Sequence, residues 1–230
     1  MDSRVHADVK HGRWPPSLYG LLGLLVVLGA GTLFATLAGD VSLRQDFPWD
    51  APVALTIHQY SSPWLDILMA AITQTGENIA LLITLVLLAW FAWRRQLLDA
   101  AALAVSFGGA VALEMLLKLF FTRPRPEFFP PIVVETGYSF PSGHVMVAVS
   151  LYGLLAVMLW QQHHRGWAVL SCGWILLVAL TRIYLGVHFP SDVLASLNLG
   201  FLWLSAVVVA RQWFQPRLPA RFLGTGANLI

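Results

Sequence analysis

Uninterrupted apolar runs, each long enough to cross a lipid bilayer, constrain this chain more than any other feature. Hydrophobic residues make up 57% of the 230-residue sequence and charged residues only 11%, whereas about a quarter of an ordinary soluble domain is charged. A helix needs about 20 apolar residues to span the hydrocarbon core. The sequence therefore predicts an all-α, polytopic integral membrane protein, a single domain over residues 1–230 with six transmembrane helices at about 17–38, 77–93, 97–121, 140–160, 167–185 and 190–213.

The polar, proline-interrupted segment between the first two runs is expected to lie at the membrane surface. It extends from Asp40 to Ser62, and Trp49 and Trp64 stand near its edges. Tryptophan is enriched at membrane interfaces because its ring is amphipathic. We expect Pro63 to Thr75 to form a short interfacial helix before the second span.

Charge and cysteine content exclude two classes of function. The formal net charge is only +2, and no Lys/Arg-rich block is present, so the sequence predicts no nucleic-acid partner. The single cysteine, Cys172, lies inside an apolar run and offers no disulfide framework, metal cluster or redox pair.

The distribution of basic residues predicts the orientation of the six spans. Alternate connections place nine basic residues on one side: Arg4, Lys10, Arg13, Arg94, Arg95, Arg165, Arg211, Arg217 and Arg221. Five remain on the other side: Arg44, Lys118, Arg123, Arg125 and Arg182. The positive-inside rule makes the first side, including both termini, cytoplasmic. The second side is then the periplasmic or extracellular face of a plasma (inner) membrane.

Charged residues are unfavourable near lipid, so the three places where they gather are informative. The first is Lys118-Leu-Phe-Phe-Thr-Arg-Pro-Arg-Pro126, at the end of the third span. Pro141-Ser-Gly-His144 opens the fourth span, and Arg182 to Asp192 joins the fifth and sixth. The topology places all three at the non-cytoplasmic face, where they can form one site.

The residue types in these clusters suit a phosphoryl group. The phosphate-binding candidates are Lys118, Arg125, Ser142, Gly143 and Arg182. Arginine offers a planar fork to phosphate oxygens, and Ser142-Gly143 resembles a helix start, where unpaired N–H groups and the helix dipole favour an anion.

The two histidines supply the chemistry. His188 and Asp192 are four residues apart, so the carboxylate can accept one imidazole N–H and leave the other nitrogen free to attack phosphorus. His144, an imidazole without a carboxylate partner, is expected to protonate the leaving oxygen. Attack by His188 predicts a phosphohistidine intermediate. No carboxylate cluster indicates a metal site, so the sequence also predicts turnover without a metal or cofactor.

Taken together, the three clusters resemble the signature of the type-2 phosphatidic acid phosphatase family, K-x6-R-P, P-S-G-H and S-R-x5-H-x3-D. The spacing agrees throughout, and the one departure is Thr181 in place of serine. The resemblance implies hydrolysis of a phosphate or diphosphate monoester on a membrane lipid: phosphatidate, phosphatidylglycerophosphate or a polyprenyl diphosphate. Two alternatives remain open, a lipid phosphotransferase and a lipid-phosphate carrier without hydrolysis. The partners expected are thus the bilayer and a lipid phosphate.

Three features near the motifs allow two interpretations each. Arg123, outside the fixed motif positions, could join the phosphate site or bind lipid headgroups and solvent. Glu114 could form an i,i+4 ion pair with Lys118 or orient it toward phosphate, and the two are compatible. The apolar connection with Phe128 and Phe129 could flank the lipid's entry to the site or pack on the first outer connection.

Overall fold

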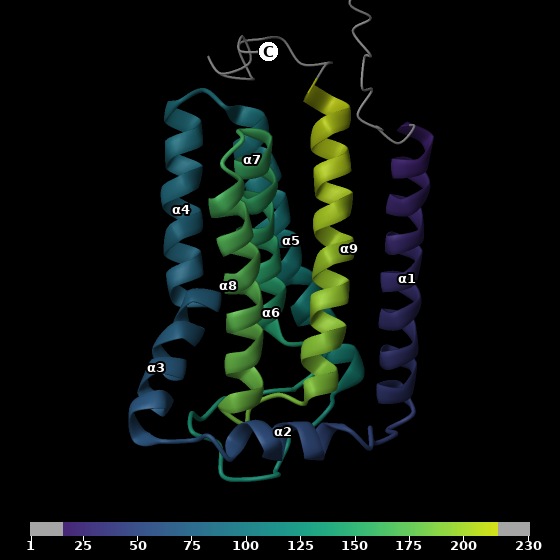
Figure 1. Cartoon of the computed structure of the whole chain (residues 1–230), viewed down its shortest axis with the longest axis vertical. Helices are drawn as coiled ribbons and strands as arrows, with labels where there is room; N and C mark the ends of the chain where they lie inside the picture. The colour runs from purple at the N-terminus through teal and green to yellow at the C-terminus, as the bar shows by residue number, and fades with distance from the viewer. Residues whose placement is uncertain (1–15, 216–230) are drawn as a thin grey trace, which may run out of the picture.

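The computed structural model describes residues 16–215, and within that range every regular element is a helix (Figure 1). The elements in chain order are α1 (Pro16–Ser42), α2 (Asp50–His58), α3 (Pro63–Thr73), the 3₁₀ turn η1 (Gln74–Gly76), α4 (Asn78–Trp93), α5 (Leu97–Phe121), α6 (Gly143–Ala148), the π-helical turn η2 (Val149–Gly153), α7 (Leu154–Gln161), α8 (Arg165–Tyr184) and α9 (Pro190–Phe214).

Within residues 16–215, six helical stretches are long and apolar enough to cross a membrane, which confirms the predicted number. They are Gly20–Ser42, Pro63–Trp93, Leu97–Phe121, Gly143–Gln161, Arg165–Tyr184 and Pro190–Phe214. The predicted interfacial helix is instead part of the second stretch, because α3 continues through η1 into α4. The chain bends there at Glu77, whose backbone angles (φ −138°, ψ −102°) lie outside the helical region.

The fourth stretch, from α6 to α7, forms the centre of the bundle. In the apolar part of this stretch 67% of the residues are buried inside the bundle, whereas only 11% are buried in the corresponding part of the first stretch. Small residues allow close helix packing. A Cβ on Gly109 of α5 would lie 2.1 Å from the Trp203 ring of α9, and one on Gly200 would lie 2.9 Å from Val149. Glycine therefore fixes how closely α9 approaches its neighbours.

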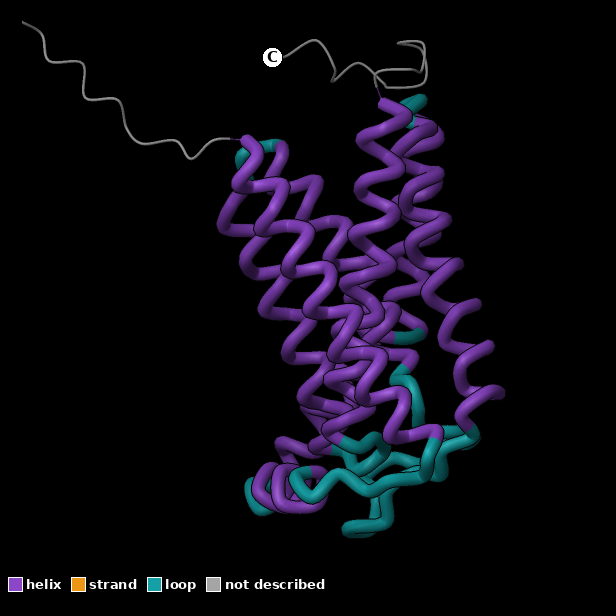
Figure 2. Tube along the Cα trace, turned by 90° about the vertical axis from the view of Figure 1, so that its right-hand side faces the viewer, coloured by secondary structure: helices purple, strands orange, loops and turns teal. Residues whose placement is uncertain are grey.

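One end of the bundle is covered by irregular chain and by α2, which lies across it (Figure 1). The connections 122–142 and 185–189 lie at the same end, and Figure 2 shows them as a layer of loops beside α2. Thr122 ends α5 in a left-handed conformation (φ 46°) and turns the chain into the first of these connections. This end holds the three motif clusters.

The opposite end carries the basic residues on which the predicted orientation depends. Arg94 and Arg95 lie between α4 and α5, Arg165 begins α8, and Arg211 lies in the last turn of α9. The other basic residues assigned to that side lie outside the described residues: Arg4, Lys10, Arg13, Arg217 and Arg221.

Candidate active site

The motif residues come from four separate elements and meet at the end of the bundle covered by α2. Lys118 lies in the last turn of α5, and Arg125 in the connection that follows. Ser142 to His144 begin α6, and Arg182 lies in the last turn of α8. The remaining two, His188 and Asp192, lie just before and within the first turn of α9. Spans that start or end at one face of the membrane necessarily bring these side chains together.

His188 is held by a backbone carbonyl more closely than by Asp192. Its Nδ1 lies 2.7 Å from the carbonyl oxygen of Ser139 and 3.6 Å from Asp192 Oδ2. The hydroxyl of Ser139 donates to the same Asp192 oxygen, and so does the backbone N–H of Phe189, at 3.1 Å. The predicted direct hydrogen bond between Asp192 and His188 is therefore wrong. Asp192 instead anchors the segment whose carbonyl binds the imidazole.

This arrangement fixes the tautomer of His188. A carbonyl oxygen only accepts hydrogen bonds, so the proton must be on Nδ1 and the lone pair on Nε2. Burial lowers the pKa of His188 well below its usual value of 6.5, and the positive charges of Arg182 and Arg125 lower it further. The imidazole is thus neutral, and its unprotonated Nε2 lies 3.4 Å from Arg125 Nη1.

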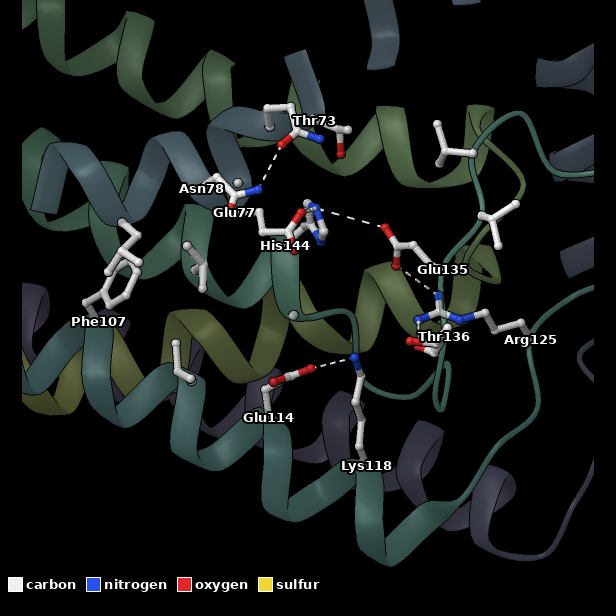
Figure 3. Close-up of a pocket in the computed structure, with 18 residues that line it drawn as sticks. Thr73, Glu77, Asn78, Phe107, Glu114, Lys118, Arg125, Glu135, Thr136 and His144 are labelled. Atoms are coloured by element: carbon white, nitrogen blue, oxygen red, sulfur yellow. Dashed lines mark hydrogen bonds and ion pairs between the residues drawn. The ribbon is translucent and has the colours of Figure 1, made fainter. Parts of the chain in front are cut away.

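The predicted phosphate-binding residues, called the phosphate cradle below, are Lys118, Arg125, Ser142, Gly143 and Arg182. Glu135 lies among them and was not anticipated from the sequence (Figure 3). Its Oε1 binds Arg182 Nη2, and its Oε2 lies 3.2 Å from Arg125 Nη1. The same Oε1 lies 4.0 Å from Nε2 of His144. Burial by itself raises the pKa of the Glu135 carboxyl, but the charges of Arg182 and His144 outweigh this and lower it to about 2. The cradle therefore holds a fully ionised carboxylate.

Three donors around this carboxylate have no hydrogen-bond partner among the described residues. They are the Oγ of Ser142, the Nε2 of His144 and the Nε of Arg182, all buried. Buried polar groups are nearly always satisfied in folded proteins, so these three groups are available to bind a ligand. A tetrahedral anion with several acceptor oxygens would suit these donors.

His144 has a carboxylate neighbour, although the sequence predicts none. Its Nε2 lies 3.2 Å from Oε2 of Glu77, at the bend between η1 and α4. The two atoms are within ion-pair distance, but the alignment falls short of a hydrogen bond. Gly76 allows this approach, since a Cβ there would lie 3.1 Å from the carbonyl oxygen of His144. Glu77 lies outside the motifs. The sequence feature that could have identified it is that it is a lone carboxylate at the start of a predicted apolar span.

Lys118 and Glu114 form the ion pair that their spacing predicts, with Nζ and Oε1 2.5 Å apart (Figure 3). The carboxylate also packs against the first residue of α6. A Cβ on Gly143 would lie 2.7 Å from Oε1 of Glu114. Gly143 therefore leaves room for the carboxylate that holds Lys118 at the cavity wall.

Arg123 lies outside the phosphate cradle and binds Asp192, the neighbour of His188. Its Nη1 donates to Asp192 Oδ1 at 2.5 Å, and its Nη2 to Asp50 Oδ2 at 3.2 Å. The guanidinium also stacks on Phe189, 3.8 Å from the ring centroid. Only 10% of the side chain is exposed, so Arg123 contacts carboxylates in place of headgroups or solvent, and a place for it in the phosphate site stays a prediction. Its two carboxylate partners account for the burial.

The two phenylalanines of the 122–142 connection pack inward. Phe129 stacks on His58 of α2 with ring centroids 3.6 Å apart, and Phe128 makes an edge contact with Phe189. Phe129 therefore packs on the first outer connection, the segment from Asp40 to Ser62, whereas Phe128 packs on the segment just before α9. Their neighbours Val133 and Val134 line the cavity instead.

A cavity of about 670 Å³ opens beside the cradle. Its polar end is lined by Lys118, Arg125, Glu135 and His144, and its apolar wall by Leu81 of α4, Phe107 and Val111 of α5, and Val147. Arg182 and His188 do not line it, so Glu135 covers the Arg182 guanidinium on the cavity side. Within residues 16–215 no group of three or more His, Cys, Asp or Glu side chains is placed to hold a metal ion.

Comparison with known proteins agrees with this geometry. A model of the PAP2 superfamily matches residues 99–216. Phosphatidylglycerophosphatase B of Bacillus subtilis (strain 168) is 37% identical over 147 residues, which are 61% of this chain and 72% of the relative. The undecaprenyl-diphosphatase of Sulfolobus acidocaldarius is 36% identical over 116 residues, 46% of this chain and 52% of the relative.

A solved structure shares the fold. The crystal structure of a transmembrane PAP2-type phosphatidylglycerolphosphate phosphatase from Bacillus subtilis matches with a TM-score of 0.74 and 28% identity, over 82% of this chain and 97% of that one. The fold and the relatives define a class, the membrane-spanning helical lipid phosphatases. Within that class, the chain belongs to the PAP2 superfamily.

Proposed function

We propose that this PAP2 protein is a metal-independent lipid phosphatase that hydrolyses a phosphate or diphosphate monoester through a phosphohistidine on His188. One observation carries the proposal. An anion, the Glu135 carboxylate, is already bound by Arg125 and Arg182, and the unprotonated Nε2 of His188 lies 3.4 Å from the same Arg125 nitrogen. A phosphate in place of that carboxylate would present phosphorus to the nucleophile.

In the first step, Nε2 of His188 forms a bond to phosphorus while the bond to the leaving oxygen breaks. Protonated His144 lines the cavity and donates its Nε2 proton to that oxygen. Arg125, Arg182 and Lys118 stabilise the negative charge on the other phosphoryl oxygens. The products of this step are the dephosphorylated lipid and phosphohistidine.

In the second step, water attacks the phosphorus of phosphohistidine. The neutral Nε2 of His144 accepts a proton from this water, the P–N bond breaks, and inorganic phosphate leaves. Both histidines then return to their starting protonation states. His188 keeps its proton on Nδ1 throughout and donates it to the carbonyl oxygen of Ser139, which holds the orientation of the ring and leaves Nε2 as the reacting nitrogen.

The substrate class follows from the cavity and from the relatives. The apolar wall between α4 and α5 provides a place for the first part of an acyl or prenyl chain, with the phosphate at its basic end. The named relatives are a phosphatidylglycerophosphatase and an undecaprenyl-diphosphatase. We therefore include phosphatidylglycerophosphate, phosphatidate and polyprenyl diphosphate in the proposed substrate class. A phosphotransferase or a non-hydrolytic carrier would use the same donor site.

The proposed orientation places the site at the non-cytoplasmic face of the plasma (inner) membrane and both termini in the cytoplasm. Four described arginines support it, since Arg94, Arg95, Arg165 and Arg211 all lie at the end opposite the site. An excess of Lys and Arg in short connections marks the cytoplasmic side.

The experiment is phosphate release by purified wild type and His188→Ala in detergent with chelator, from phosphatidylglycerophosphate, phosphatidate and undecaprenyl diphosphate in turn. The proposal predicts release by wild type and none by the variant. Transfer of the phosphoryl group to an added lipid alcohol in preference to water would indicate a phosphotransferase. Binding of the lipid phosphates without release would indicate a carrier.

A further inference from the structure

The side chains of Arg123, Asp50 and Asp192 form a buried charged cluster outside the phosphate cradle. Asp192 lies next to the candidate nucleophile, His188. The guanidinium of Arg123 lies between two carboxylates, with Nη1 2.5 Å from Asp192 Oδ1 and Nη2 3.2 Å from Asp50 Oδ2. Asp192 is 0% exposed and Asp50 2% exposed. Asp50 lies outside the three motifs, and Arg123 occupies a variable position of the first motif.

The cluster joins three elements that are distant in the sequence. Asp50, at the start of α2, accepts hydrogen bonds from the backbone N–H of Ser191 at 2.7 Å and from its hydroxyl at 2.6 Å. Arg123 follows α5, and its carbonyl accepts the backbone N–H of Ser139 at 2.8 Å. Asp50 and Arg123 thus hold both the start of α9 and the segment whose carbonyl binds His188.

The charges do not balance, because two buried carboxylates share one guanidinium. The groups that contact Asp192 are Arg123, the hydroxyl of Ser139, the backbone N–H of Phe189 and the imidazole of His188. Arg123 is the one permanent cation in this set, which is drawn from residues 16–215. Burial raises the pKa of Asp50, and the hydrogen bonds from Ser191 and the charge of Arg123 oppose that shift. Without Arg123, two buried anions would remain, and a proton would bind to neutralise one of them.

We propose that Arg123, held in place by Asp50, is a positioning residue that keeps Asp192 ionised and thereby fixes Ser139 and the reacting tautomer of His188. The proposal rests on the proposed function, since it assigns Arg123 an effect on the His188 nucleophile. Asp192 must be an acceptor for both the Ser139 hydroxyl and the Phe189 N–H. A protonated Asp192 would offer one acceptor fewer and would release the segment that orients the imidazole.

The test is a charge-rescue experiment with three variants of the full-length protein: Arg123→Gln, Asp50→Asn and the double variant. Arg123→Gln should lower kcat about 10- to 100-fold, the range found when the outer groups that orient metal-binding histidines are removed. KM should change little because Arg123 does not line the cavity. The acid limb of the pH profile of kcat/KM should move to higher pH, since Asp192 loses the cation that favours its ionised form.

Asp50→Asn should move the same limb to lower pH, because it removes the anion that competes for Arg123. The asparagine oxygen can still accept the Ser191 N–H. The double variant restores the wild-type net charge of the cluster, so its kcat and acid limb should return toward wild type. A role in packing alone predicts the reverse, a double variant at least as impaired as Arg123→Gln. That result would overturn the inference.

Two controls separate the possible failures. Arg94→Gln removes an exposed arginine at the far end of the bundle and should leave the profile unchanged. If Arg123→Gln does not fold, Arg123→Lys and Asp50→Asn carry the test: the lysine must keep the wild-type acid limb, and the asparagine must lower it. An inactive wild type would refute the proposed function, whereas an active wild type with no rescue would refute only the role of Arg123.

Discussion

Replacing Glu135 by glutamine should make the enzyme bind phosphate more tightly. The Glu135 carboxylate occupies the donors that a phosphate needs, namely Arg182, Arg125 and Nε2 of His144. A ligand phosphate must displace it before it can reach His188, which does not line the cavity. Glutamine has nearly the same shape but no charge, so it is a weaker competitor for the arginines.

The magnitude follows from the pKa of this carboxyl, which falls from its ordinary 4.5 to about 2. Each pKa unit is about 1.4 kcal/mol, so the site favours the carboxylate by about 3 kcal/mol. This stabilisation is complete above about pH 4.5 and is lost as pH falls toward 2. If a phosphate must offset all of it, the substitution should tighten phosphate binding up to about 300-fold, the factor that a shift of about 2.5 pKa units represents. The side chain is 22% exposed, so solvent screening makes this an upper bound.

The assay is competitive inhibition of phosphate release from the lipid substrate by inorganic phosphate at neutral pH. The inhibition constant should fall at least tenfold in Glu135→Gln. The matched control is Glu127→Gln, which removes an exposed carboxylate from the same connection and should leave the constant unchanged. An inhibition constant that stays the same or rises in Glu135→Gln would refute the competition and indicate that the carboxylate assists phosphate binding.

Three further substitutions test the packing around the site. Gly143→Ala should lower kcat/KM, because its Cβ would displace the carboxylate of Glu114 that holds Lys118; phosphate release measures this, and full activity would contradict it. Phe129→Ser should lower the thermal midpoint, because the ring packs on His58. It should also lower the activity on long-chain and short-chain substrates equally. A selective loss of activity on long-chain substrates would support the hypothesis that this connection flanks the entry of the lipid. Gly109→Ala should destabilise the protein by about 1–3 kcal/mol in a detergent melt, as overpacked substitutions do, whereas Gly108→Ala, with open space at its Cβ, should not.

The fold was largely predictable because each membrane-spanning helix requires a long run of apolar residues, which is visible in the sequence. Runs of about 20 apolar residues must be helices, since no other local structure satisfies the backbone in lipid. The sequence analysis placed a break before Glu77 and missed that α3, η1 and α4 continue through the bend there as one apolar stretch. A single polar residue does not show whether a helix ends or bends. The convergence of the motifs followed from counting spans, since helices that end at one face place their terminal residues together.

The parts of the site that were missed depend on contacts between irregular segments. Ser139, Glu135 and Asp50 lie in outer connections, and each reaches its partners across more than 40 positions of sequence. Helical spacing suggested that Asp192 binds His188 directly, but the Ser139 carbonyl lies closer to the imidazole. The arginine and histidine positions were predictable because the motifs fix them, whereas their carboxylate partners follow no local spacing rule.

Capture of the phosphorylated enzyme tests the central claim, nucleophilic attack by His188, most directly. The measurement uses an activated aryl phosphate, whose leaving group needs no general acid, with chelator present and an alkaline quench before peptide mass spectrometry. We predict a phosphoryl group on the His188 peptide, more abundant in His144→Gln because water then lacks its general base, and none in His188→Ala. Turnover by His188→Ala, or a phosphoryl group on another residue, would contradict the mechanism.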